Sequence, residues 1–485
     1  MAKFTLAEIL GATGGELRQF PGKTGASDIA EFELTGISTD TRTIEEGNLF
    51  LALIGENFDG NKYAVAAVND GAAALVLSTM EHAPEDVPVI LVPDTKIALE
   101  KIAEYYRKRL ACKVVAVTGS VGKTSTREMI ASALSRGCKV YATKNNNNNE
   151  IGLSQTILAA PEDTDVIVLE MGMRLRGEIS ELTNIAHPDV AVITNIGVAH
   201  IERLGSREEI LKAKLEILEG LAEGGLLILP YADEYLQKAV AEGMIREDVK
   251  IAYTFTEKTS LEKHPYGMAV AESIDIEGDR ICCHAVAGFE EMVSVVLRLS
   301  VVGIHHVGNA LAGLLCGLYL GVTPDRIEEG IASFVQIGHR ERLVKVDNIC
   351  FLDDSYNAGP ESMMSAFASI RRLAGEKKAY ACIGDMLELG DVSKEKHFEI
   401  GAKAAELGLD GLLVIGDFCK DVMDGAKSVD PDVSVYCFEN KDQMTEKLAN
   451  IVEDGDYVLL KASHAFEMYT ILESYGSIVR KGNEP

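Results

Sequence analysis

The sequence lacks the features of a membrane protein and of a nucleic-acid binder. No uninterrupted apolar run reaches the ~20 residues that a membrane-spanning helix needs. Basic residues are in the minority, since 47 Lys and Arg stand against 75 Asp and Glu and give a net charge of −28. We therefore expect no membrane insertion and no binding to nucleic acid or anionic membranes. We interpret the acidity as a solubilising surface.

The cysteine pattern lacks the spacing of a disulfide framework or of a C-x-x-C motif. Nine cysteines are spread over the chain, and only Cys282 and Cys283 are close neighbours. No signal peptide is recognisable at the start of the sequence. Together these absences predict a protein without disulfides in a reducing cytoplasm.

The length and the rhythm of the chain predict three α/β domains. A chain of 485 residues is too long for one hydrophobic core, and its 47% hydrophobic content suffices for globular packing. Strand and helix patterns alternate throughout, and we divide them into residues 1–110, 111–336 and 337–485. We expect a small α/β domain, a central doubly wound parallel sheet with a small antiparallel insertion over 268–299, and a Rossmann-like third domain. In such sheets, ligands bind at the carboxyl ends of the strands.

The strongest motif is a phosphate loop at residues 118–125. A buried strand over Val114–Val117 precedes it, and we expect a helix over Arg127–Arg136. Glycines let the backbone approach anionic oxygens, Lys123 would reach the β- and γ-phosphates, and the Thr124 hydroxyl suits Mg²⁺. The eight-residue form of this motif needs a first glycine at Val117, so only the shorter Gly-x-x-Gly-Lys-Thr-Ser form is present. The expected ATP-binding loop consists of Thr118, Gly119, Ser120, Val121, Gly122, Lys123, Thr124 and Ser125.

Three further residues of the central segment are candidates for a metal site. Glu170 and His200 come just beyond two expected strands, Asp165–Leu169 and Asp189–Asn195. Their position suits metal ligands beside the phosphates, although a capping or core role explains either residue equally well. Lys214 lies in an expected helix over Glu208–Leu218, where a solvated charged face is the simple explanation.

Polar clusters also occur in the outer segments. The turn from Ser38 to Arg42 could hold a polar ligand, or be only a capped turn with a local ion pair. In the third segment, polar residues gather after expected strands. No Gly-x-Gly-x-x-Gly follows the first of those strands, so a dinucleotide cofactor is not expected.

The order of these motifs resembles the Mur ligase family over nearly the whole chain. The resemblance includes Asp40-Thr41-Arg42, the phosphate loop, Asn148-Asn149-Glu150-Ile151-Gly152, Lys212-Ala213-Lys214-x-Glu216 and Gly384-Asp385-Met386-Leu387-Glu388-Leu389-Gly390. The Asn-Asn-Glu-Ile-Gly and Gly-Asp-Met-Leu-Glu-Leu-Gly stretches favour the member that adds D-alanyl-D-alanine over its sister ligases.

The resemblance implies an ATP-dependent amide ligase. Its substrates would be UDP-N-acetylmuramoyl-tripeptide and D-alanyl-D-alanine, joined through an acyl phosphate in peptidoglycan precursor synthesis. It implies two Mg²⁺ sites, with Thr124 and Glu170 at one, His200 at the other, and Lys214 carbamylated to give an anionic oxygen ligand. We expect a monomer.

The resemblance also assigns roles to other residues. Nucleotide contacts fall on Asn309, Arg340, Asp354 and Asn357. The UDP-sugar and peptide side has Ser38, Asp40, Thr41, Arg42, Asn61, Asn148 and Asn149, and the dipeptide side has Asp385, Lys461 and Ser463.

Three assignments leave alternatives. Arg342 could replace Arg340, and Asn146 and Asn147 could replace Asn148 and Asn149 in the run of five asparagines. His464 stands where the family usually has arginine. Competing functions are another Mur-type or folylpolyglutamate-like ligase, and a phosphate-loop switch ATPase that makes no product.

Overall fold

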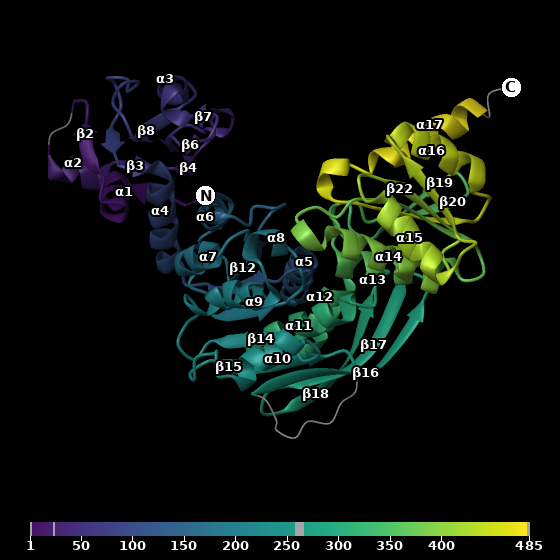
Figure 1. Ribbon diagram of the computed structural model, residues 1–485. Helices are drawn as coiled ribbons and strands as arrows, with labels where there is room; N and C mark the ends of the chain where they lie inside the picture. The colour runs from purple at the N-terminus through teal and green to yellow at the C-terminus, as the bar shows by residue number, and fades with distance from the viewer. Residues whose placement is uncertain (1, 23–24, 258–265, 483–485) are drawn as a thin grey trace.

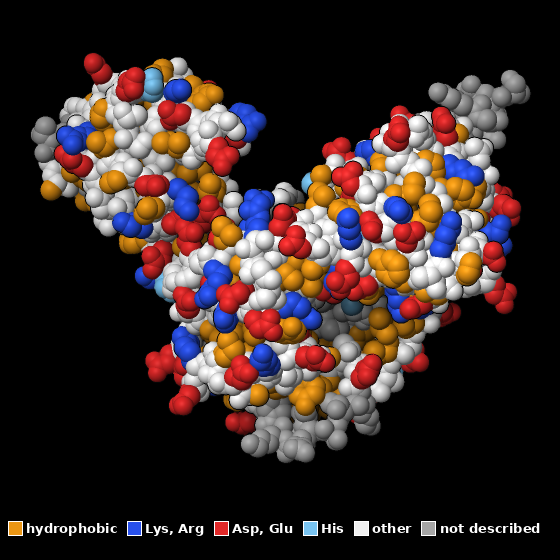
Figure 2. Space-filling model, in the orientation of Figure 1, with side chains coloured by type: hydrophobic (Ala, Val, Ile, Leu, Met, Phe, Trp, Pro, Cys, Tyr) orange, Lys and Arg blue, Asp and Glu red, His pale blue; other side chains and the backbone are white. Residues whose placement is uncertain are grey.

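The protein has a three-domain α/β architecture, which confirms the predicted fold class (Figure 1). The computed structural model describes residues 2–22, 25–257 and 266–482. Figure 1 shows the first and third domains on either side of the central one, and Figure 2 shows an open gap between these two outer domains. Within the described ranges, no helix combines the length and the apolar character needed to cross a membrane.

The first domain is built on a five-stranded sheet of order β2-β9-β8-β5-β4, with two small two-stranded sheets, β1-β3 and β6-β7. Its elements are β1 Phe4–Thr5, α1 Leu6–Thr13, β2 Glu16–Gln19, α2 Ala26–Glu31, β3 Glu33–Leu34, β4 Gly36–Ser38, β5 Asn48–Leu51, β6 Ile54–Gly55, β7 Phe58–Asp59, α3 Ala64–Asn69, β8 Ala72–Leu77, β9 Val89–Leu91 and α4 Thr95–Arg109.

The central domain contains a nine-stranded sheet of order β11-β12-β10-β13-β14-β15-β16-β17-β18. Its elements are β10 Lys113–Thr118, α5 Lys123–Leu134, β11 Val140–Ala142, α6 Glu150–Ala159, β12 Val166–Glu170, α7 Glu178–Ala186, β13 Val190–Ile193, α8 Ile201–Leu204, α9 Arg207–Leu215, β14 Leu226–Pro230, α10 Glu234–Ala241, β15 Lys250–Phe255, β16 Gly267–Glu277, β17 Arg280–Gly288, β18 Met292–Leu299, α11 His306–Tyr319 and α12 Pro324–Ala332.

The antiparallel strands expected over 268–299 are present, and they extend the main sheet of this domain. β16 pairs parallel with β15, and β17 and β18 then continue antiparallel from it. The turn between β16 and β17 touches the third domain, because Arg372 donates to the Gly278 carbonyl at 2.9 Å and to the Val302 carbonyl at 2.5 Å. The end of the central sheet formed by β16, β17 and β18 therefore contacts the third domain.

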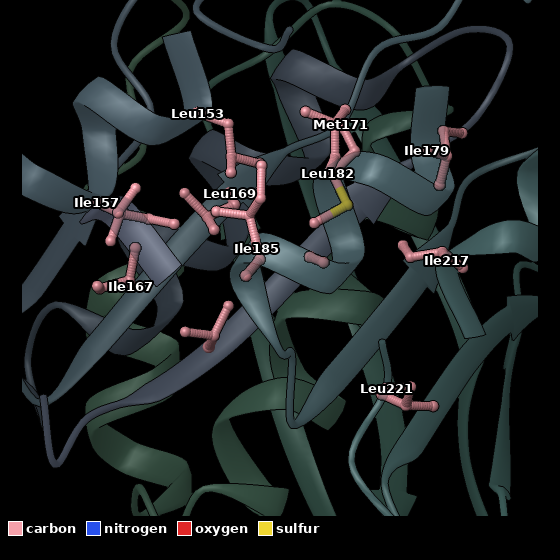
Figure 3. Close-up of a cluster of buried hydrophobic side chains, with 14 of the residues drawn as sticks. Leu153, Ile157, Ile167, Leu169, Met171, Ile179, Leu182, Ile185, Ile217 and Leu221 are labelled. Atoms are coloured by element: carbon pink, nitrogen blue, oxygen red, sulfur yellow. The ribbon is translucent and has the colours of Figure 1, made fainter. Parts of the chain in front are cut away.

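Helices cover both faces of the central sheet, as a doubly wound sheet requires. Alternate residues of β10 point to opposite faces: Val114 and Ala116 join a core with α6, α7, α9 and α10, while Val115 and Val117 join one with α5, α11 and α12. Figure 3 shows part of the first core, where side chains of α6, β12 and α7 meet around Leu169. This packing fixes the carboxyl ends of the strands as a rigid edge.

The third domain has a six-stranded sheet of order β19-β20-β24-β21-β22-β23, in which β19 alone is antiparallel to its neighbour. Its elements are β19 Arg342–Val346, β20 Ile349–Asp353, α13 Pro360–Ala374, β21 Ala379–Gly384, α14 Ser393–Glu406, β22 Gly411–Ile415, α15 Cys419–Val429, β23 Ser434–Phe438, α16 Lys441–Ile451, β24 Tyr457–Lys461 and α17 Thr470–Gly482.

The first helix, α1, begins at Leu6, directly after the two-residue strand Phe4–Thr5. A capping box sets this boundary, since the Glu8 amide donates to Thr5 Oγ1 at 3.2 Å and the Thr5 amide donates to Glu8 Oε2 at 2.7 Å. The prediction of a protein without disulfides is wrong, because the structure joins Cys419 and Cys437 in a disulfide across α15 and β23. Their separation of 18 residues matches no motif, and only the fold brings them together.

Candidate functional site

A cavity of about 600 Å³ lies between the central and third domains. Its walls come from the carboxyl ends of the central strands, from the start of α11, from the loop that follows β20 and from the end of β24. Among the residues predicted from the sequence, it is lined by Ser120, Val121, Gly122, Lys123, Thr124, Ser125, Asn148, Glu170, Asn309, Arg340, Asp354, Asn357 and Lys461.

The phosphate loop joins β10 to α5 and is held open by a neighbouring asparagine. Asn195 Oδ1 accepts hydrogen bonds from the amides of Ser120 at 3.0 Å and Val121 at 2.9 Å. Gly119 needs to be glycine, because its φ is +151° and a Cβ there would lie 1.8 Å from Thr194 Oγ1. The loop thus has the close backbone approach that phosphate oxygens require.

Lys123 begins α5, four residues earlier than the helix start expected at Arg127. The helix N-terminus therefore opens directly onto the cavity, where its free amide groups favour an anion. Lys123 Nζ donates to the Gly119 carbonyl at 2.9 Å. Burial lowers the pKa of Lys123, although the carboxylate of Glu170 raises it.

Glu170 is the last residue of β12 rather than the residue beyond it. Its side chain is almost fully buried, and it is paired on both oxygens. Arg127 Nη1 lies 3.3 Å from Oε2, and Asn148 Nδ2 donates to Oε1 at 2.9 Å. Arg127 was not predicted as a site residue. Nothing in its helical context marks it, because its role depends on the strand that faces it.

His200 and Lys214 lie within electrostatic reach of Lys123. His200 has φ +64°, and its Nδ1 lies 2.6 Å from Glu388 Oε2 of the third domain. Burial lowers the pKa of His200, Glu388 raises it, and Lys123 and Lys214 lower it further. The net effect is a pKa of His200 below its usual value, which favours the uncharged ring with a nitrogen lone pair.

Lys214 is buried in α9, with 1% of its surface exposed, so the expectation of a solvated face is wrong. The described part of the chain provides no hydrogen bond and no ion pair for its amine. Burial, and then the charge of Lys123, lower the pKa of Lys214 well below the usual value for lysine. An uncharged buried amine is the form that can react with CO₂.

The third domain presents Arg340 to the cavity. Its guanidinium carbon lies 3.7 Å from the centre of the Tyr356 ring, and burial lowers its pKa. Arg342 is exposed at the start of β19 and does not line the cavity. On the other side of Tyr356, His464 Nδ1 lies 3.2 Å from the Tyr356 carbonyl. The geometry favours Arg340 as the arginine that meets a nucleotide.

Asp354 and Lys461 form a buried pair in the same wall. Lys461 Nζ lies 2.5 Å from Asp354 Oδ2 and donates to the Asn357 carbonyl at 3.0 Å. Burial raises the pKa of Asp354, while Lys461 lowers it. Lys461, expected on the dipeptide side, thus lies with the residues expected at the nucleotide.

A hydrogen-bonded chain links α5 to the linker before β19. Thr126 Oγ1 donates to Asn309 Oδ1 at 2.9 Å, Asn309 Nδ2 lies 3.3 Å from His306 Nδ1, and His306 Nε2 lies 3.0 Å from Glu341 Oε2. Only Asn309 was predicted. Burial raises the pKa of Glu341, but His305 and His306 outweigh it and lower that pKa to about 2.

The residues expected at the UDP-sugar lie in the first domain and form a capped turn. Asp40 caps the 3₁₀ turn Thr41–Thr43, and Arg42 Nη2 lies 2.5 Å from Asp40 Oδ2. Hydrogen bonds from Arg42 lower the pKa of Asp40 to about 2. Ser38 Oγ donates to the Asp40 carbonyl at 2.8 Å. The side chain of Arg42 is 86% exposed and remains available to a ligand.

Several other predicted residues have local structural roles. Asn61 is buried, and its amide bonds to Asp59 and Ser78. Asn149 caps α6 through the Gly152 amide at 2.9 Å, whereas Asn146 and Asn148 line the cavity.

The residues expected beside the dipeptide also make local contacts. Asp385 is buried and accepts from the Asp417 amide at 2.7 Å, and burial raises its pKa. Ser463 Oγ accepts from the Leu387 amide at 2.8 Å. The first contact joins the loops after β21 and β22, and the second joins the loops after β21 and β24.

The donor set fits Mg²⁺. Thr124 and Glu170 line the same cavity and offer the hard oxygen atoms that Mg²⁺ prefers. His200 and Lys214 lie near Lys123, and Lys214 provides an oxygen ligand only once it is modified.

Comparison with known proteins places this architecture in one family. The first, central and third domains match models of the Mur ligase family, catalytic domain, over residues 33–107, of the Mur ligase middle domain over 117–317, and of the Mur ligase glutamate ligase domain over 339–464. The UDP-N-acetylmuramoyl-tripeptide–D-alanyl-D-alanine ligase of Bacillus subtilis is 37% identical over 90% of this chain and 92% of its own. The chain belongs to the Mur ligase family.

Solved Mur ligase structures share the fold over nearly the whole chain. A crystal structure of MurF from Acinetobacter baumannii has a TM-score of 0.84 at 29% identity, and the match covers 98% of this chain and 99% of that one. MurF from Thermotoga maritima in complex with ADP has a TM-score of 0.78 at 27% identity, over 92% and 98% of the two chains.

Proposed function

We infer that this Mur ligase joins D-alanyl-D-alanine to the C-terminal carboxylate of UDP-N-acetylmuramoyl-tripeptide, with hydrolysis of ATP to ADP and phosphate. The observation that carries the inference is the cavity in which the phosphate loop and Lys123 face Arg340 of the third domain. Several relatives named for this reaction support the choice of substrates, and one similar structure holds ADP. The reaction belongs to cytoplasmic peptidoglycan precursor synthesis.

Each domain has a proposed role. Residues 1–110 would bind the UDP-sugar near the turn Ser38–Arg42, and residues 111–336 would bind ATP on the phosphate loop. Residues 337–485 would close over ATP and bring the dipeptide, near Asp385 and Ser463. A hydrogen bond between Gln155 of α6 and Thr39, at 2.7 Å, connects that turn to the central domain.

The chemistry proceeds through an acyl phosphate. A carboxylate is a poor electrophile, so its oxygen first attacks the γ-phosphorus of ATP and ADP leaves. The dipeptide amine then attacks the acyl carbon, loses a proton, and expels inorganic phosphate as the amide bond forms. Two anions must meet in the first step, and Lys123, with Arg340 opposite, would offset their repulsion. Closure of the third domain would keep water from the acyl phosphate.

We also propose two Mg²⁺ ions and a carbamylated lysine. Thr124 and Glu170 would hold one ion, and His200 and carbamylated Lys214 the other. Bound Mg²⁺ neutralises phosphate charge in phosphoryl transfer. The low pKa of Lys214 supplies the uncharged amine that combines with CO₂ and releases a proton. Lys214→Ala should therefore lose activity and regain part of it with added short carboxylates, and full activity of Lys214→Ala would contradict the proposal.

A coupled phosphate assay tests the function. Phosphate release should require both the UDP-tripeptide and D-alanyl-D-alanine, and should give one pentapeptide per phosphate. Release that ignores both substrates would favour a switch ATPase. Release that requires a different amino acid or a folate would favour another Mur-type or folylpolyglutamate-like ligase.

A further inference from the structure

Three side chains that the proposed ligase reaction does not use converge between the central and third domains. His305 and His306 lie at the start of α11, and Glu341 lies in the linker before β19. One oxygen, Glu341 Oε2, lies 3.0 Å from His306 Nε2 and 3.5 Å from His305 Nε2. Ligand atoms of all three residues lie within 4.8 Å of one another. This set of two imidazoles and one carboxylate differs from the oxygen-rich set at Thr124 and Glu170.

The spacing matches a tetrahedral transition-metal ion. Zinc lies roughly 2.0–2.2 Å from imidazole nitrogens and carboxylate oxygens, which places tetrahedral ligands about 3.3 Å apart. The two distances to Glu341 Oε2, 3.0 Å and 3.5 Å, bracket that value. His306 and Glu341 are buried, whereas the side chain of His305 is 42% exposed and lines the cavity. An ion can therefore enter from the cavity and keep one position open to solvent.

The surroundings of His306 orient its ring for metal binding. Its Nδ1 lies 3.3 Å from the amide of Asn309, which in turn bonds Thr126 Oγ1 at 2.9 Å. Metal binding needs the proton on Nδ1 and the lone pair on Nε2. Rotation of the Asn309 amide meets this need, because its oxygen then accepts from Nδ1 and its nitrogen donates to the Thr126 hydroxyl. A second partner that fixes the imidazole in this way is typical of metal ligands.

We propose that His305, His306 and Glu341 form a binding site for a zinc-class transition metal, separate from the Mg²⁺ positions of the ligase reaction. The histidines belong to the central domain and Glu341 to the linker that begins the third. An ion held by all three joins the domains at the linker, so its occupancy would regulate their relative movement.

Titration of the metal-free protein with Co²⁺ tests the site without nucleotide or substrate. We expect one equivalent of Co²⁺ to produce the visible d–d absorption of a tetrahedral nitrogen and oxygen site, and one equivalent of Zn²⁺ to abolish it. A large excess of Mg²⁺ should leave the absorption unchanged, because Mg²⁺ prefers oxygen ligands. Absence of the band, or its loss with Mg²⁺, would overturn the proposal. Neither result depends on ligase activity.

Variants locate the ion. His306→Asn and His305→Asn should each weaken Zn²⁺ binding by at least about tenfold, since each removes one ligand. His187→Asn is the matched control, because His187 Nε2 lies 3.0 Å from Glu104 Oε1 without a second imidazole, and its φ of +44° suits asparagine. It should bind one equivalent with unchanged affinity. Unchanged binding in both test variants, with circular dichroism showing a native fold, would assign the ion elsewhere and refute the site.

Discussion

Lys214 carries a cost in folding free energy that the proposed carbamylation would change. Its amine is buried in α9 without an acidic partner, beside the positive charge of Lys123. Burial of a charge without a partner costs free energy, and this cost is what lowers the pKa of Lys214. Conversion to a carbamate would replace the ammonium with an anion beside Lys123. The positive charge of Lys123, which penalises the protonated lysine, would therefore favour the proposed modified form.

Replacement of Lys214 by methionine should stabilise the protein in CO₂-depleted buffer. Because the pKa of Lys214 is lower in the folded than in the unfolded state, the unfolded state binds more protons, so the penalty is full below the folded pKa and disappears as the pH rises to the unfolded value. Lys214→Met should raise the midpoint of thermal unfolding by at least about 2 °C at neutral pH, and by less near pH 10. An equal gain at both pH values would contradict this origin. Lys212→Met, on the exposed side of α9, should change little.

Arg340 and Arg342 offer a matched pair for the nucleotide contact. Arg340 packs on Tyr356 inside the cavity, whereas Arg342 is exposed on β19. We expect Arg340→Lys to raise the KM for ATP and lower kcat/KM by about 10- to 100-fold, because lysine keeps the charge but loses the flat stacking surface. Arg342→Lys should stay within about twofold. Steady-state kinetics at saturating UDP-tripeptide and dipeptide measure both, and the reverse ranking would move the assignment to Arg342.

At the scale of elements, the loop between β10 and α5 combines local and distant constraints. Gly119 and Gly122 both have positive φ, of +151° and +84°, so the loop needs glycine at two places. Thr194 from the next strand closes over it, with Thr194 Oγ1 donating to the Val121 carbonyl at 2.5 Å. The shape of the phosphate loop thus depends on residues that follow two neighbouring strands, β10 and β13.

Gly119→Ala should abolish nucleotide binding. The added Cβ would lie 1.8 Å from Thr194 Oγ1, so the loop or the β13 end must move away from its present path. We expect a loss of at least about 100-fold in kcat/KM and weak binding of a fluorescent ATP analogue, at a cost of roughly 1–3 kcal/mol of backbone strain. Gly11→Ala in α1, where a Cβ has open space, is the control and should keep full binding. Normal nucleotide affinity in Gly119→Ala would show that this glycine is not required.

The elements also show what the sequence can predict. The phosphate loop was found because its strand, glycines and lysine are contiguous, and the uninterrupted apolar run Val114–Val117 predicted a buried strand. Arg127, His306 and Glu341 were missed because their partners lie on other elements. Only the fold brings Glu170 to Arg127, and only the fold brings His306 and Glu341 together. The helix pattern alone favoured a solvated face for Lys214, since such a pattern does not reveal which charged side chain is buried, and only the family resemblance pointed to a site role. Strand β15 was not expected, although the hairpin that follows it was.

At the scale of the whole molecule, the residues of the proposed site are divided among the three domains, and the gap between the two outer domains is open. The nucleotide cavity lies between the central and third domains, while the turn Ser38–Arg42 lies in the first domain, across the open gap of Figure 2. Synthesis of an amide needs all three substrates together and water excluded. The proposed reaction therefore requires movement of at least one outer domain.

Small-angle X-ray scattering should detect this movement. With a non-hydrolysable ATP analogue, Mg²⁺ and UDP-tripeptide together, we expect the radius of gyration to fall relative to the free protein. Either ligand alone should give a smaller change, because the binding free energy of both is needed to bring the domains together. Arg340→Lys should weaken the compaction, and Arg342→Lys should not. An unchanged scattering curve with all ligands bound would contradict closure.

The contact between Arg372 and the turn at Gly278 limits what kind of movement is open to the third domain. That domain is attached to the central one through the linker at Glu341 and again at this turn. Two anchored points define a line, and a rigid body held at both has one degree of freedom left, a swing about that line. The third domain would then rotate about this line as a hinge axis. The contacts of Glu361 with Val198 and of Glu388 with His200 would hold it in its present position. Removal of one of the two attachments, as in Arg372→Ala, would let the third domain twist as well as rotate about this axis.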